Sequence, residues 1–288
     1  MTHTTRRSAA LVLALLALAA PAFTDTIYFR AAEEEPGRLV KMTAKTVVFE
    51  GLDGIKEYDK ADVLKIQLQR ARAYDDIETL EQITDPDLRA CLENQPGQAD
   101  FPAAGSVTLL ERHVYDLRRP GLVVDTVRQI VKVLQQRGED AASNSVWYFE
   151  DTCVPRIDFA LTVTPDGRVL HLDDSALKNE SIFAALPIYR RLSRFRFACK
   201  EPRPGSVLDV QYTVERALDP PLEPLYSEEL FRGDQPMLRK EVVVLVPAAA
   251  EARVAAELSG PDVVEATRSV KDGVVRLAWT LTEPQRGI

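Results

Sequence analysis

Residues 207–215 read Val-Leu-Asp-Val-Gln-Tyr-Thr-Val-Glu, and apolar and polar residues alternate along this stretch. Successive side chains of a β-strand point to opposite faces, so the pattern predicts a strand with one buried and one wet face. A second decisive stretch is Thr164-Pro-Asp-Gly-Arg168, whose Pro and Asp-Gly favour a tight turn between the β-rich runs 159–163 and 169–172. Together they predict antiparallel β-structure.

Outward from these stretches, similar runs recur with turn-forming residues between them. They occupy residues 107–115, 123–134, 242–246 and 274–281. Runs of β-branched and aromatic residues separated by Pro and Gly are typical of strands. Their spacing predicts that residues 105–288 fold as an antiparallel β-sandwich, and that the protein is mainly β.

A second β-rich region comes earlier in the chain. Five short runs of β-branched and aromatic residues lie between residues 24 and 70, with glycines between them. An open sheet this small would expose its edges, which favours curling into a barrel. The stretches 25–29, 37–40 and 58–66 resemble the SH3-like and Lsm-like barrels at the front of exported bacterial proteins. We therefore expect a small β-barrel over residues 24–70.

Residues 71–104 change to helical spacing. Tyr74, Ile77 and Leu80 lie three residues apart. Asp85 is a favoured N-cap residue, and Pro86 suits the first helical position. The pattern predicts two short helices followed by a loop, which we interpret as a linker between the two β regions.

The first 22 residues have the three parts of a secretory signal peptide. A basic start precedes an apolar run over residues 9–20, and Ala20-Pro21-Ala22 fits the small-residue cleavage pattern. The run is shorter than the roughly 20 residues that a membrane-spanning helix needs. We expect cleavage near Ala22, export to the periplasm or the extracellular space, and no transmembrane segment in the mature chain.

The composition excludes several functional classes. Lys and Arg number 36 against 44 Asp and Glu, which gives a formal net charge of −8. An acidic chain has no general attraction for phosphate backbones, so nucleic acid is not an expected partner. The chain has only three His and three Cys and no glycine-rich phosphate loop. It therefore predicts no metal centre and no cofactor.

The larger β region resembles the domain of unknown function 3857. The resemblance rests on residues 130–134 with Gly138, on the stretch 164–170 and on Pro204-Gly-Ser-Val-Leu-Asp-Val-Gln-Tyr-Thr-Val-Glu215. In many exported bacterial proteins this domain stands ahead of a transglutaminase-like core with a papain-like Cys-His-Asp arrangement. The resemblance thus implies catalysis in a core beyond residue 288, and no catalytic residue carries over to this chain.

The most basic stretch of this acidic chain covers residues 189–197. Period-two alternation there places arginines on one strand face and phenylalanines on the other. The stretch supplies a candidate binding patch for an acidic envelope polymer or a partner protein, made of Arg190, Arg191, Arg194 and Arg196. The alternative is a strand that has one solvated and one buried face.

Three adjacent aromatic residues form a second candidate. On a strand, Trp147 and Phe149 share the face opposite Tyr148. Such rings are expected to pack in a core, and the alternative is a platform on which sugar rings stack.

The sequence around the cysteines and histidines does not indicate a catalytic site. Cys153 and Cys199 lie in strand-rich sequence and form the candidate disulfide, with three unpaired thiols as the alternative. His113 and His171 have carboxylates nearby, but no Ser or Cys in a nucleophile turn accompanies them. We interpret both as ordinary surface histidines.

These observations favour a non-catalytic, exported binding or scaffolding module of the cell envelope, with an unidentified protein or polymer partner. The alternative is the accessory front of a longer transglutaminase-like or cysteine-protease-like enzyme. A third hypothesis is a carbohydrate-binding module that uses Trp147 or Arg194.

Overall fold

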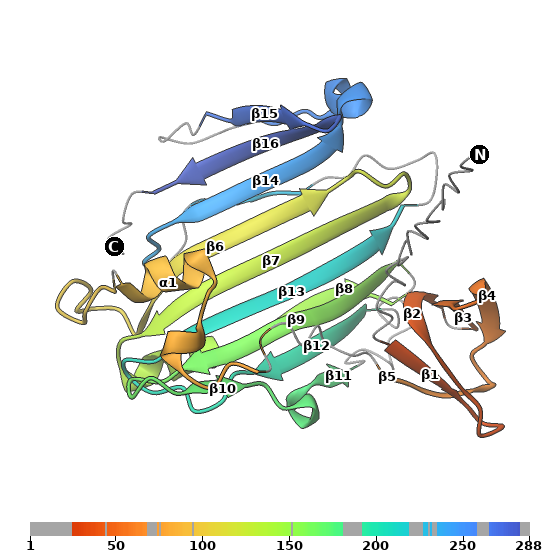
Figure 1. Ribbon diagram of the computed structural model, residues 1–288, viewed down its shortest axis with the longest axis horizontal. Coiled ribbons are helices and arrows are strands. Elements are labelled where there is room, and N and C mark those ends of the chain that lie inside the picture. Colours follow the sequence, from red (N-terminus) through yellow and green to blue (C-terminus); the bar gives the residue numbers. More distant parts are fainter. Residues whose placement is uncertain are drawn as a thin grey trace, which may run out of the picture.

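The β-rich regions form three sheets in the computed structural model (Figure 1). The structure describes residues 25–43, 45–67, 74, 76–93, 95–150, 152–180, 192–218, 227–229, 231, 235–257 and 265–282. The predicted signal peptide and the two arginines at 190 and 191 lie outside these residues. Mainly β structure, as predicted, is confirmed.

The strands are β1 (Asp25–Phe29), β2 (Glu34–Met42), β3 (Thr46–Gly51), β4 (Gly54–Asp59), β5 (Val63–Gln67), β6 (Ser106–Asp116), β7 (Leu122–Val133), β8 (Ser143–Phe149), β9 (Cys153–Val163), β10 (Val169–His171), β11 (Lys178–Glu180), β12 (Leu192–Ala198), β13 (Val207–Ala217), β14 (Lys240–Pro247), β15 (Thr267–Lys271) and β16 (Val274–Leu281). The helices are η1 (Leu80–Gln82), α1 (Pro86–Glu93), η2 (Gln136–Ala142), η3 (Asp174–Ala176) and η4 (Ala248–Arg253).

The N-terminal sheet has the strand order β4-β3-β2-β1-β5, with each described pair antiparallel. All five strands contribute side chains to one apolar cluster, which includes Ile27, Phe49 and Val63. The expected barrel is corrected in one respect, because the edge strands β4 and β5 form no ladder within the described residues. The sheet surrounds its core but is not closed by hydrogen bonds.

This sheet is anchored to the rest of the molecule through β9. Arg156 of β9 forms an ion pair with the buried Asp25 and donates a hydrogen bond to the Leu39 carbonyl at 2.7 Å. Val154 packs into the apolar cluster of the N-terminal sheet, and Arg38 pairs with Glu215 of β13. Apolar and charged contacts therefore join the two parts.

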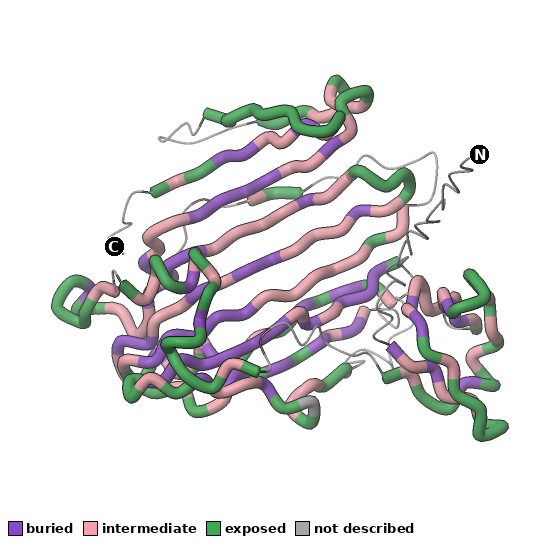
Figure 2. Tube along the Cα trace, in the orientation of Figure 1, coloured by how far each residue is buried: buried purple, intermediate pink, exposed green. Residues whose placement is uncertain are grey.

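The largest sheet has eight strands in the order β10-β9-β13-β7-β6-β14-β16-β15. Its central strands carry most of the buried residues, whereas β15 is exposed along its length (Figure 2). The described pairs are antiparallel except that β14 runs parallel to β6. The predicted antiparallel pairing thus has one parallel exception, which arises because the chain crosses from β13 in mid-sheet to the far side of β6 before β14 begins.

One face of this sheet is covered by the three-stranded sheet β11-β12-β8. Val146 and Tyr148 of β8 and Phe195 of β12 enter one buried cluster with Ile157 of β9 and Leu208 of β13. The arrangement is sandwich-like, as predicted. We call this side of the eight-stranded sheet the sandwich face.

The opposite face, which we call the helix face, is covered by the segment predicted as a linker. Asp85 caps α1 as expected, since its Oδ1 accepts the backbone N–H of Leu88 at 2.8 Å. Ile83, Leu88 and Phe101 are buried against side chains of the sheet such as Leu110. The segment is thus part of the core of the larger β domain.

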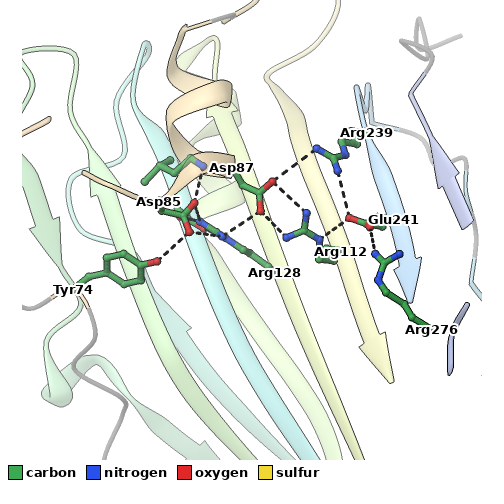
Figure 3. A network of polar contacts seen from close by, with 10 residues as sticks. Tyr74, Asp85, Asp87, Arg112, Arg128, Arg239, Glu241 and Arg276 are labelled. Carbon is green, nitrogen blue, oxygen red and sulfur yellow. Dashed lines mark hydrogen bonds and ion pairs between the residues drawn. The ribbon is translucent and has the colours of Figure 1, made fainter. Parts of the chain in front are cut away.

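A network of ion pairs fastens α1 to the helix face (Figure 3). Arg128 of β7 lies 2.7 Å from Asp209 of β13 and 2.8 Å from Asp85, while Arg112 of β6 lies 2.6 Å from Asp87. The network contains four carboxylates and four guanidinium groups, from Asp85, Asp87, Asp209, Glu241, Arg112, Arg128, Arg239 and Arg276. Its formal charges balance, and its ion pairs join α1 to β6 and β7.

Among the described residues, no helix has the length and apolar character that crossing a membrane requires.

Candidate functional site

The outer face of the three-stranded sheet carries two large exposed aromatic side chains. Trp147 is 48% exposed and Phe149 is 55% exposed, whereas Tyr148 between them is buried. The alternation follows from β8 lying over the apolar cluster of the sandwich face, which takes every second side chain. The expected sharing of a face by Trp147 and Phe149 is confirmed, but the expectation that these rings pack in a core is wrong for both, because their face points to solvent.

The neighbouring strands place charged side chains beside these rings. Residues directly opposite each other in antiparallel strands share a face. Arg194 of β12 is opposite Trp147, and Glu180 of β11 is opposite Arg194. Lys178 is opposite Arg196 in the same way. We call this outer surface the aromatic–arginine face, made of Ser145, Trp147, Phe149, Lys178, Glu180, Leu192, Arg194 and Arg196.

The contacts on this face fix Arg194 more firmly than Arg196. The Arg194 guanidinium lies 5.4 Å from the Trp147 ring centroid and 2.7 Å from Glu180. Arg196 is 3.5 Å from the same carboxylate. The hydrogen bond from Arg194 holds the pKa of the Glu180 carboxyl below its usual range. Three cations and one anion leave this surface with a net charge of +2 on an acidic chain.

Two of the four arginines of the predicted patch therefore lie on a common surface with Trp147. In sequence, the arginines and the aromatic residues are two separate candidates. Their juxtaposition depends on the register of β8 against β12, whose paired residues are about 50 positions apart in the chain. Alternation within each strand was visible in sequence, but the register was not.

Two of the three cysteines are poor candidates for a reactive site. Burial raises the pKa of the Cys91 thiol to about 11 and that of Cys199 to about 12, so neither carries the thiolate that nucleophilic attack requires. All three thiols are free.

The candidate disulfide is not formed, and the strand register explains why. Cys153 begins β9 opposite Arg216 of β13. Cys199 lies beside the other end of β9, where the adjacent Lys200 carbonyl accepts a hydrogen bond from Thr162. Nine residues of extended chain, roughly 30 Å, separate Cys153 from Thr162. A disulfide needs Cα atoms within about 7 Å.

His113 is not a surface histidine, contrary to expectation. Its ring lies on the sandwich face with Nε2 3.4 Å from Glu111 and Nδ1 3.3 Å from Glu229. One ligand atom from each of these three residues lies within 4.8 Å of the others, a set that could hold a metal ion. Lys240 Nζ lies 2.6 Å from Glu111 and 3.0 Å from Glu229. A metal ion would have to displace this ammonium group.

The geometry around His113 favours a structural role. Tyr115 donates a hydrogen bond to Glu229 and lies 2.7 Å from Ser227. These contacts, together with those of Lys240, hold the segment at 227–229 against β6 and β14. The other predicted histidine, His171, has Nε2 2.6 Å from the Ile77 carbonyl and so connects β10 to the helical segment.

Asp125 of β7 lies in the same region and makes stability depend on pH. Burial raises the pKa of its carboxyl to about 6, with the Glu229 charge adding to the effect and His113 opposing it. A folded-state pKa above the unfolded value means that ionisation costs stability as pH rises from about 4 to 6. We expect Asp125→Asn to raise the free energy of unfolding by about 3 kcal/mol at pH 8 and by almost nothing at pH 4.

Urea unfolding of both proteins at the two pH values measures this difference. Asp116→Asn is the matched control, because the hydrogen bond from Arg118 lowers the pKa of Asp116 and the substitution should destabilise at pH 8. Equal effects of Asp125→Asn at pH 4 and pH 8 would show that the Asp125 charge carries no such cost.

The architecture defines a class of protein, a β domain with a mixed eight-stranded sheet covered on one face by a smaller sheet and on the other by a short helix. The chain belongs to the family described as a domain of unknown function with a solved structure, DUF3857, whose model matches residues 119–286. The resemblance inferred from sequence is thereby confirmed. No curated protein matches the sequence.

Solved structures were found to be similar at low sequence identity. A candidate protease from Parabacteroides distasonis matches with a TM-score of 0.55 and 18% identity, over 65% of this chain and 37% of that one. The chain thus spans well under two thirds of that protein's length. An M1 zinc metallopeptidase mutant from Deinococcus radiodurans matches with a TM-score of 0.32 and 15% identity, over 62% of this chain and 40% of that one. Legionella pneumophila aminopeptidase A matches with a TM-score of 0.35 and 12% identity, over 67% of this chain and 21% of that one. The latter two similarities carry no argument about this chain.

Proposed function

We propose that this chain is a non-catalytic, exported binding module of the cell envelope that engages an acidic partner through the aromatic–arginine face. The observation that carries the proposal is the placement of Trp147 directly opposite Arg194 on a solvent-exposed surface. Trp, Tyr and Arg are the residues that dominate binding energy at interfaces. The sandwich core beneath β8 and β12 keeps their backbones in place before any partner binds.

Two further features support this proposal. The predicted leader implies that the mature chain meets envelope components. The raised pKa values of Cys91 and Cys199 are the opposite of what thiol catalysis requires.

Co-sedimentation of the purified chain with the insoluble envelope fraction of its host tests the proposal. We expect the wild-type protein to sediment and the double variant Trp147→Ala/Phe149→Ala to lose at least tenfold in affinity. The control is Val270→Ala, which removes an apolar side chain of similar exposure on β15. Equal sedimentation of the wild type and the double variant would contradict a role for this face.

A second candidate is the accessory front domain of a longer enzyme of the peptidase or transglutaminase type. It is favoured by the fold shared with the candidate protease from Parabacteroides distasonis, of which this chain matches 37%. Intact mass spectrometry of the exported native protein distinguishes the two candidates. A mass that exceeds the mass of this chain by the equivalent of a few hundred residues would favour the accessory role. A mass near that of residues 23–288 would favour a stand-alone module.

A further inference from the structure

We infer that the ligand of the aromatic–arginine face is an anionic polysaccharide, with sugar rings stacked on Trp147 and Phe149 and carboxylates paired with Arg194 and Arg196. This inference rests on the proposed function and gives that site a ligand class.

The arrangement of the two rings indicates a ligand with repeating flat units. Trp147 and Phe149 are two positions apart on β8 and lie on the same side of it. At about 3.3–3.4 Å per residue, their Cα atoms are separated by roughly 6.7 Å along the strand. A ligand that covers both must present two apolar surfaces in succession. The C–H faces of consecutive sugar rings in a polymer have this property.

The charges on the same surface indicate that the polymer is anionic. Arg194, Arg196 and Lys178 outnumber the one carboxylate, Glu180, on a protein with a formal net charge of −8. A guanidinium group matches a carboxylate through two parallel hydrogen bonds. The Arg196 side chain is 47% exposed and its contact with Glu180 is 3.5 Å, which leaves donors available for a ligand carboxylate.

The contacts of Arg194 give it a positioning role beside the aromatic rings. Its guanidinium is held between the Trp147 ring at 5.4 Å and Glu180 at 2.7 Å. A side chain fixed in this way loses little entropy when a ligand binds. Arg194 therefore keeps a positive charge next to the place where a sugar ring would stack.

An acidic protein segment is the competing occupant. Extended peptides bind sheets through main-chain hydrogen bonds at an edge strand, with pockets for alternate side chains. Here the rings and guanidinium groups project from the sheet face, where a ligand lies across side chains. Stacking and carboxylate pairing on a face fit a polysaccharide better than an added strand.

Binding to three polymers tests the inference. Polygalacturonate presents uronic acid rings, dextran presents neutral rings, and polyglutamate presents carboxylates without rings. Affinity electrophoresis of the whole chain is expected to show binding to polygalacturonate at least tenfold tighter than to the other two. Trp147→Ala and Arg196→Ala should each weaken that binding at least threefold, and their combination at least tenfold.

The control variant is Arg268→Ala/Val270→Ala, which removes an exposed, ion-paired arginine and an exposed apolar residue two positions apart on β15. It should bind as the wild type does. Circular dichroism melts of all variants check that the fold is kept, as expected for exposed positions.

Three results would overturn the inference: equal binding of polyglutamate, equal binding of dextran, or no binding of polygalacturonate. If the envelope co-sedimentation still depends on Trp147 and Phe149 in any of these cases, the binding module stands and only the ligand class is wrong. If co-sedimentation is also independent of both residues, the proposed function fails with it.

Discussion

Arg128→Met is expected to lower the free energy of unfolding by about 3–5 kcal/mol, because it leaves buried carboxylates without their partner. Arg128 is almost completely buried, and its guanidinium group pairs with Asp85 (Figure 3). The same group pairs with Asp209 at 2.7 Å. Burial raises the pKa of the Asp209 carboxyl despite its hydrogen bonds from Arg128. Without the arginine, the cost of an ionised Asp209 in the core has no compensation.

Urea unfolding followed by circular dichroism at pH 7 measures this loss. The double variant Arg128→Met/Asp209→Asn should recover a large part of it, since it removes the unpaired charge. A loss below about 1 kcal/mol in the single variant, or no recovery in the double variant, would show that the pair contributes little.

Leu88→Ala is expected to lower the free energy of unfolding by about 2–5 kcal/mol, the range for truncating a fully buried leucine. Leu88 lies on α1 and is completely buried against the helix face of the eight-stranded sheet. Leu80→Ala is the matched control, because Leu80 in η1 is 40% exposed and should cost well under about 1 kcal/mol. The same unfolding measurement applies. Similar small effects of both substitutions would mean that residues 80–93 form a linker that does not contribute to the core.

Local features of this protein were predictable from sequence because they depend on neighbouring residues. The alternation of β12 buries Phe195 and Phe197 and exposes Arg196, as the pattern predicts. The cap of α1 by Asp85 depends only on the consecutive residues 85–88. The family resemblance likewise rested on short contiguous stretches, and the family model matches the same region.

Features that depend on pairing between distant segments were not predictable. Arg128 and Asp209 are 81 positions apart, and Glu229 reaches His113 from 116 positions away. Neither pair has a local pattern. Periodicity identifies which residues of a strand are buried, but it does not indicate the strand that pairs with it. For this reason only the structure shows that β14 is the parallel neighbour of β6. The same holds for the placement of Cys153 and Cys199 at opposite ends of β9.

The parallel pairing of β14 with β6 has a consequence for the order of folding. Strands β6, β7, β13 and β9 are joined by antiparallel pairs, whereas β14 follows β13 after a connection of 22 residues between Ala217 and Lys240. Closing that loop costs chain entropy before any contact between β14 and β6 compensates for it. The β14-β16-β15 hairpin layer can form locally and then add to the completed centre. We therefore expect the blue edge of the sheet in Figure 1, whose outermost strand β15 is exposed along its length, to open more readily than the centre, which hydrogen exchange would measure.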